Sequence, residues 1–160
     1  MSNLIVEFQQ QDNWEQIWSD HIEAQPIDGN PNRRIPIRTI PIPILVSSPI
    51  VAFFVDSDTA APHWRYAGMC RQIIPTGLTI GGVTNANVEQ RKLYLYRINL
   101  LVLPRLTAEY SLFIDVPYWI VDLRLNLFEY TGLIADSTEI SFLSLEEDIS
   151  RLEDKIDSLG

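Results

Sequence analysis

The chain has 160 residues, of which 46% are hydrophobic and 21% charged, a composition that predicts one folded domain and excludes disorder over the whole length. Its formal net charge is −9, so the surface lacks the positive excess that phosphate contacts need, and we expect no nucleic-acid partner. The single cysteine, Cys70, excludes an intramolecular disulfide and a cysteine-rich zinc site, and we expect no metal and no cofactor.

The first residues and the uncharged stretches give no sign of export or of a membrane helix. Residues 1–8 lack a basic segment and already include Glu7, and no Asn-x-Ser/Thr sequon occurs in the chain. The uncharged run over residues 39–55 contains Pro41, Pro43 and Pro49, which would break a spanning helix. We therefore expect a soluble protein that is made in the cytoplasm and has no membrane partner.

The first 23 residues predict a short strand followed by a helix. Residues 4–8 read Leu-Ile-Val-Glu-Phe, which favours a strand. Asp12 and Glu15 form the pattern of a capping box, in which two side chains satisfy free N–H groups of a first helical turn. This pattern predicts a helix over about residues 13–23, and apolar residues recur there at helical spacing, at Trp14, Ile17, Trp18 and Ile22.

The next segment predicts a loop and then a strand at the edge of a sheet. Residues 25–34 contain Asp-Gly and Asn-Pro, which are typical of loops. Residues 35–46 alternate apolar residues with Pro41 and Pro43, and a proline cannot donate a hydrogen bond to a neighbouring strand, so an edge position is expected. Nearby arginines either bind an acidic partner, such as the C-terminal helix of another subunit, or protect this edge from aggregation; they are Arg33, Arg34 and Arg38.

Short segments rich in Val, Ile and Tyr follow up to residue 130. A polar loop is expected from Gly81-Gly82 to residue 90, and it lacks the Lys-Ser/Thr ending of a phosphate loop. The pattern predicts a mainly β fold: an antiparallel sandwich or barrel of about seven or eight strands, with a short N-terminal helix and a C-terminal amphipathic helix. After the edge strand, the expected strands cover residues 50–55, 64–74, 78–80, 91–103, 106–116 and 118–130.

The strand predicted over residues 118–130 carries apolar side chains on both faces. One face, from Trp119 to Leu127, is apolar throughout and is expected to be core. A solvated face seldom carries as many large apolar groups as the other one, so we expect that face to contact another protein chain. The alternative is that the helix predicted over residues 13–23 covers it. The residues of this face are Tyr118, Ile120, Asp122, Arg124, Asn126, Phe128 and Tyr130.

From residue 133 onward the pattern is that of an acidic helix. Ser144 and Glu147 form a second capping box and predict a helix over about residues 144–158. We expect its heptad seam to pair chains, with packing on the chain's own β-domain as the alternative. Residues 136–160 hold most of the net charge, and we expect a β-domain over residues 1–132 and a linker with the helix over residues 133–160. The seam residues are Leu145, Ile149, Leu152, Ile156 and Leu159.

The histidines and the cysteine occur without the spacing of a catalytic or metal-binding motif. His21 lies near Asp20 and Glu23 but lacks a third ligand at a diagnostic spacing. His63 is a possible general base, yet no nucleophile motif accompanies it. Cys70 within a strand is typical of a small buried hydrophobe.

The acidic residues of the β region give equally little sign of a reaction centre. Asp56 and Asp58 suit a turn better than a calcium loop, which needs more oxygen ligands than this run offers. Asp115 and Asp122 would form a glycosidase pair only if the fold brought them to a defined separation. We therefore expect a protein that is not an enzyme.

Three functions remain on these grounds, in decreasing order of support. The first is a non-enzymatic structural subunit that self-associates and docks into a larger protein assembly, such as a virus or phage particle, with itself and other proteins as partners. The second is a carbohydrate- or small-ligand-binding sandwich that uses aromatic residues such as Trp64, Tyr66 or Tyr118. The third is a hydrolase built around His63 with Asp115 or Asp122.

Overall fold

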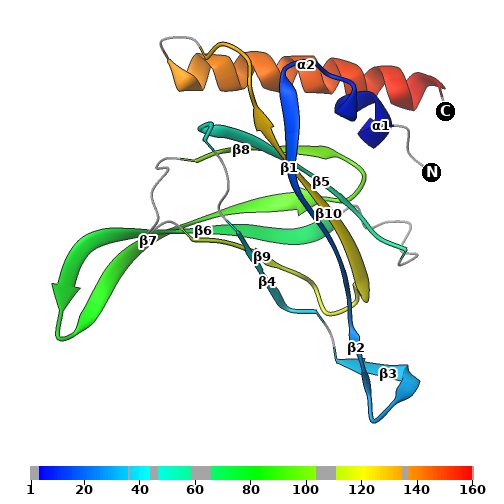
Figure 1. Ribbon diagram of the computed structural model, residues 1–160, viewed down its shortest axis with the longest axis vertical. Coiled ribbons are helices and arrows are strands. Elements are labelled where there is room, and N and C mark those ends of the chain that lie inside the picture. Colours follow the sequence, from blue (N-terminus) through cyan, green and yellow to red (C-terminus); the bar gives the residue numbers. More distant parts are fainter. Residues whose placement is uncertain are drawn as a thin grey trace.

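The protein folds into three layers, two antiparallel sheets and a helical layer (Figure 1). The computed structural model describes residues 4–35, 37–43, 47–58, 66–103, 111–134 and 137–159. Sheet A lies between the helices and sheet C, and a two-stranded sheet B extends from the end of the molecule opposite the long helix. The expected fold class, mainly β with antiparallel pairing and helices near both ends, is confirmed.

The strands of each sheet come from distant parts of the chain. Sheet A has the order β1 (Trp14–Glu23), β10 (Asp122–Tyr130), β5 (Ile50–Asp56) and β8 (Ile98–Val102). Sheet B pairs β2 (Gln25–Ile27) with β3 (Asn30–Ile35). Sheet C has the order β4 (Thr39–Ile42), β9 (Ser111–Asp115), β6 (Tyr66–Ile80) and β7 (Val83–Tyr94). The helices are α1 (Leu4–Gln9) and α2 (Thr138–Leu159).

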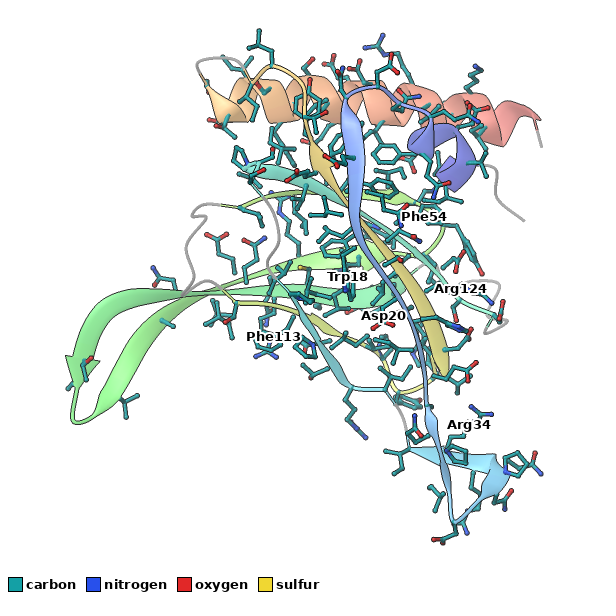
Figure 2. All side chains as sticks on the ribbon, in the orientation of Figure 1. Trp18, Asp20, Arg34, Phe54, Phe113 and Arg124 are labelled. Atoms are coloured by element: carbon teal, nitrogen blue, oxygen red, sulfur yellow. The ribbon has the colours of Figure 1, made fainter. Side chains whose placement is uncertain are left out.

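Two hydrophobic cores lie on the two faces of β5, which is buried over almost its whole length. Successive side chains of a strand point to opposite faces. Phe53 and its neighbours at i±2 accordingly pack between sheets A and C, whereas Phe54 and Ala52 pack under the helices. Figure 2 shows Phe54 toward the helical layer and Trp18 toward sheet C. Burial on both faces explains why this strand reads as a continuous apolar run.

The first residues form a helix, so the strand predicted over residues 4–8 is wrong. Leu4 and Phe8 are four residues apart and therefore lie on the same face of α1, where both are buried. The Phe8 ring meets the Phe128 ring edge-on at 4.9 Å and lies 5.1 Å from the Trp14 ring. Such a short helix is stable only through its packing, which sequence periodicity over five residues does not reveal.

The helix predicted over residues 13–23 is also wrong, because these residues form β1. The strand pairs with β10 along its whole length, and its register shifts between Gln16 and Trp18. This bulge adds a residue, so Trp14 faces the helical layer while Trp18 packs against the core between the sheets. The bulge also gives the apolar residues a spacing that imitates a helix.

Three loop and strand boundaries differ from those expected. Residues 25–34, expected as a loop, belong largely to the β2–β3 hairpin, whose turn has positive φ at Asp28 (53°) and Gly29 (73°). Residues 64–74 and 78–80, expected as two strands, fall on the single strand β6, apart from residues 64–65, which lie outside the described residues. The loop expected over residues 81–90 is mostly strand β7.

The strand predicted over residues 91–103 is divided by a turn between β7 and β8. Tyr96 adopts φ 60° there, and the Asn99 side chain accepts a hydrogen bond from the Tyr94 N–H (2.9 Å) and donates one to the Tyr94 carbonyl (3.0 Å). These bonds replace the ladder at the turn, so the chain crosses from sheet C to sheet A.

Three further strands agree with the sequence more closely. β4 lies at the edge of sheet C, which confirms the expected edge position, although it covers only Thr39–Ile42 and residues 44–46 lie outside the described part. β9 falls within the predicted strand 106–116, of which residues 106–110 are not described. β10 begins at Asp122, because residues 118–119 form a turn.

The C-terminal helix begins earlier than the second capping box predicts. α2 starts at Thr138, where the Ile140 N–H reaches the Ser137 hydroxyl at 3.4 Å. Ser137 rather than Ser144 therefore caps the helix.

Candidate functional site

The most prominent exposed feature is a two-stranded arm formed by residues 74–87 of β6 and β7. In the described residues β6 pairs with β9 from Met69 to Ile73, and residues 104–110, which precede β9, are not described. From Ile74 to Ile80 the strand that pairs with β6 in the described part of the chain is β7. Figure 1 shows this hairpin extending away from the three layers.

The arm carries no Asp, Glu, Lys or Arg, although all of its residues whose burial is described are exposed. Ile80 is 69% exposed and Val83, which pairs with it, is 66% exposed. Natural proteins commonly protect free strand edges with charges, prolines or bulges, because an exposed apolar edge pairs with other chains. The composition of the arm is that of a surface that another protein covers.

The two edges of the arm are not equivalent. On β6, Pro75 has no N–H to donate, Gly77 adopts φ 80°, and the register shifts between Pro75 and Thr79. β7 contains no proline, and its register with β6 is regular from Val88 to Leu93. β7 also forms the outer edge of sheet C. The edge that remains competent for pairing is therefore that of β7.

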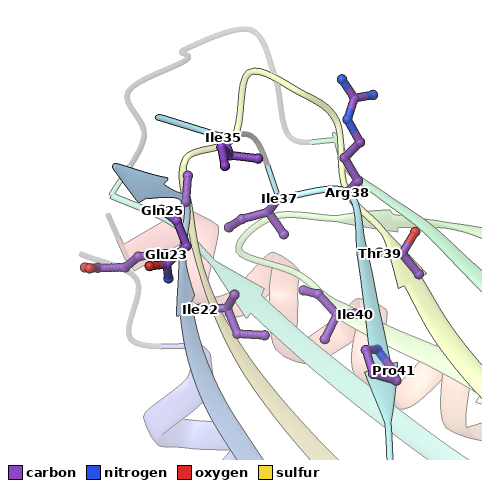
Figure 3. A pocket seen from close by; sticks show the side chains of 10 residues that line it. Ile22, Glu23, Gln25, Ile35, Ile37, Arg38, Thr39, Ile40 and Pro41 are labelled. Carbon is purple, nitrogen blue, oxygen red and sulfur yellow. The ribbon is translucent and has the colours of Figure 1, made fainter. Parts of the chain in front are cut away.

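A groove of about 380 Å³ lies where the end of β1 meets β4. Figure 3 shows Ile22, Ile37 and Ile40 pointing into it, with the Arg38 and Glu23 side chains directed away. Its walls are mostly apolar, although Gln25 and Thr39 also line it, so it offers an apolar ligand a surface and few groups for polar recognition.

Several of the polar residues singled out in the sequence form one network at the ends of β5 and β10. The Asp122 carboxylate accepts hydrogen bonds from the Ser57 hydroxyl (3.0 Å) and the Asp58 N–H (3.0 Å), and it lies 3.8 Å from Nε2 of His21. Arg124 bonds the Asp58 carboxylate at 2.9 Å through Nη1. These interactions hold the segment that follows β5 against β10, as expected for a turn at the end of a strand.

Asp56 is the member of this network whose ionised form is disfavoured by burial. Burial raises the pKa of its carboxyl above the ordinary value of 3.8, and the nearby Arg124 guanidinium opposes that shift only in part. Arg124 Nη1 lies 3.6 Å from Asp56 Oδ1, an atom that is buried without a hydrogen bond in the described structure.

The other candidates are held apart from this network. Asp115 belongs to sheet C, where it accepts bonds from Arg71 Nε (3.0 Å) and the Thr39 hydroxyl (3.0 Å), whereas Asp122 belongs to sheet A. Each carboxylate is thus engaged in its own interactions. His63 and Trp64 lie outside the described residues. Among the side chains that are described, no group of three His, Cys, Asp or Glu is arranged to hold a metal ion.

Cys70 is the buried hydrophobe that the sequence indicated. It is fully buried between the sheets, and burial raises the pKa of its thiol to about 12. The thiolate, which is the reactive form, is therefore negligible at neutral pH.

The face of β10 predicted as a contact surface is largely covered by the chain itself. Ile120, Asp122 and Phe128 are buried, and Phe128 lies beneath α1. The open apolar surface expected there is absent from the described structure, because the helices cover Phe128 and Ile120 packs in the core between sheets A and C. Tyr118 is 71% exposed, and Arg124 and Tyr130 are partly buried.

The heptad seam of α2 likewise faces the chain's own sheet. Leu145 packs with Ile50, and Ile149 packs with Phe54 and Phe128; Leu152 and Ile156 border the same core. The seam therefore corresponds to the alternative reading, packing on the β-domain, and not to an exposed pairing stripe. The Leu159 side chain is not described.

No family model, no curated protein and no solved structure matches the chain. None of the described helices is long and apolar enough to cross a membrane.

Sequence reasoning missed the arm because it assigned residues 81–90 to a loop. Two signals were present: Gly81-Gly82 is a common two-residue hairpin turn, and uncharged β-branched residues flank it. Both glycines have positive φ, 60° and 81°, as a tight hairpin turn requires.

Proposed function

We propose that this protein is a non-enzymatic structural subunit that self-associates and docks into a larger protein assembly. The observation that carries the proposal is the uncharged arm of residues 74–87, in which Ile80 and Val83 are exposed. A virus or phage particle stays a prediction about the setting of that assembly, based on analogy at the level of fold.

Energetics favour an arm that is covered by another chain. A two-stranded hairpin with both faces in water is marginally stable by itself. Burying a side chain such as Ile or Val stabilises a complex by about 1.5–3 kcal/mol, so docking Ile80 and Val83 would contribute several kcal/mol to association. An arm without a partner would gain no stability from exposing these apolar residues or from lacking charged ones.

Shortening the arm tests this proposal. Residues 76–85 are replaced by Asn-Gly, which closes a two-residue turn between the paired residues Pro75 and Ala86. No described side chain of the arm belongs to a hydrophobic core, so the circular dichroism spectrum should be unchanged while the mass in solution, measured by light scattering, falls. A matched control replaces exposed Tyr118 with Ser, and it should keep the mass of the unmodified chain. An arm-shortened chain with unchanged assembly would contradict the proposal.

The second candidate function, small-ligand binding, is favoured by the isoleucine-lined groove. Its aliphatic lining suits an apolar ligand rather than a sugar, and neither Tyr66 nor Tyr118 contributes to it. A medium-chain fatty acid that raises the melting temperature of the unmodified chain, but not that of an Ile40→Glu variant, would support this function. A hydrolase around His63 stays the weakest prediction.

A further inference from the structure

β7 combines a free edge with a self-complementary charge pattern. It pairs with β6 on one side, and in the described residues no strand pairs with its other side. The described part of sheet C thus ends in an edge that remains able to accept a strand.

Two of the three charged residues of β7 lie symmetrically about Gln90. Glu89 precedes it and Arg91 follows it, and all three side chains are exposed. No ion pair joins Glu89 or Arg91 to another described residue. The Arg91 guanidinium stacks on the Phe142 ring at 5.2 Å, which holds it on the face of sheet C that points toward sheet A. Glu89 lies two residues away on the same face.

We propose that two copies of this chain join β7 to β7 in antiparallel register, with the two-fold axis at Gln90, so that sheet C continues from one copy into the other. The inference rests on the proposed function and names the self-association partner and its register. The symmetry makes the contact self-complementary, as in most closed dimers.

The register follows from the charges. With the axis at Gln90, Glu89 of each copy lies opposite Arg91 of the other, which gives two equivalent ion pairs on one face. Side chains directly opposite are about 4.5–5.5 Å apart at Cβ, whereas the like charges sit on diagonals of about 7–8 Å, so attraction exceeds repulsion. Lys92 falls opposite Val88, where its aliphatic stem contacts an apolar side chain.

The same register places the second copy next to the exposed surface of the arm. β7 of one copy runs antiparallel past Tyr94 of the other, so the arm tip is directed toward the β7–β8 turn of the second copy. Tyr94 and Tyr96, at that turn, are 44% and 41% exposed. Ile80 and Val83 of one copy thus approach aromatic side chains of the other.

A cysteine at the axis tests the register. In a Gln90→Cys variant the two introduced thiols face each other, so mild oxidation or a short bis-maleimide should link most of the protein into a covalent dimer. Asn87→Cys is the matched control: it is also exposed on β7, but its two thiols would lie about 20 Å apart in this register. The buried Cys70, whose thiol pKa is raised to about 12, does not compete.

Charge reversal gives an independent readout by sedimentation. Glu89→Arg places like charges opposite each other at both symmetric positions and should weaken dimerisation about tenfold or more. Adding Arg91→Glu recreates both pairs with opposite polarity and should restore the dissociation constant to within about threefold. Restoration by the second reversal is the result that a general surface effect would not give.

The outcomes separate this inference from the proposed function. Efficient linkage at position 90 together with charge rescue supports the β7 register. An oligomer that links equally at positions 87 and 90, or that ignores charge reversal, overturns the register and leaves self-association standing. A chain that is monomeric at every concentration overturns both.

Discussion

The burial of Phe128 shows that part of the second face of β10, the face directed at the helices, belongs to the interior. Its side chain is 1% exposed because Phe8 of α1 covers it, although alternation along the strand assigns it to the outward face. On the same face Arg124 and Asn126 are only partly buried. The face therefore changes from partly open to fully covered along one strand, according to where the helical layer lies.

The consequence is measurable by urea denaturation. Phe128→Ala should lower the free energy of unfolding by about 3–5 kcal/mol, the usual cost of removing a buried aromatic ring. Tyr118→Ala, at a position that is 71% exposed, should change it by less than about 0.5 kcal/mol. Equal effects of the two substitutions would contradict the assignment of Phe128 to the core.

Asp56 makes stability depend on pH in a defined direction. Its folded-state pKa is raised above the ordinary value of 3.8, because burial disfavours the carboxylate. The native state therefore holds the proton more tightly than the unfolded chain does. The contribution of this carboxyl is present at low pH and is lost as the pH rises through its folded pKa.

An Asp56→Asn variant isolates this contribution. The free energy of unfolding of the unmodified chain, relative to that of the variant, should fall as the pH rises from about 4 to 7. Urea denaturation at both pH values checks it. A relative stability that rises over this range would mean that the Arg124 pair, 3.6 Å away, outweighs burial.

At the scale of elements, the sequence predicted the strands whose pattern depends on composition alone. The edge strand β4 was recognisable from its prolines and β5 from its continuous apolar run. β1 and α1 were not, because tertiary contacts determine them. The bulge of β1 gives a strand the spacing of a helix, and α1 is too short for periodicity to distinguish it from a strand.

The candidate site was predictable only in part for the same reason. The residues predicted as contact surfaces lie on faces of β10 and α2 that have no partner evident in the sequence, and packing of the helices on sheet A buries Phe128, Leu145 and Ile149. The arm was readable in the uncharged sequence around Gly81-Gly82. Its exposure was not, because exposure depends on tertiary contacts that the local pattern does not contain.

The seam of α2 provides a prediction at this scale. Ile149→Ala should lower the free energy of unfolding by about 2–5 kcal/mol, because it opens a cavity under the helix. Ile140→Ala, on the same helix but 63% exposed, is the control and should have little effect. An Ile149→Ala chain of full stability that dissociates from its oligomer would instead indicate a seam between chains.

At the scale of the whole molecule, helices, sheet A and sheet C bury both faces of the central sheet within one chain. The surfaces left for partners are then peripheral: the β7 edge, the arm and the groove beside β4. Of these, the β7 edge has no paired strand among the described residues, and the arm is a ribbon without charged residues whose described positions are exposed.

Sedimentation equilibrium of the unmodified chain tests the central claim, self-association, most directly. The account predicts a concentration-dependent mass that reaches at least twice the 18.3 kDa of one chain at micromolar concentrations. A mass that stays at that of one chain over the whole accessible range would contradict it.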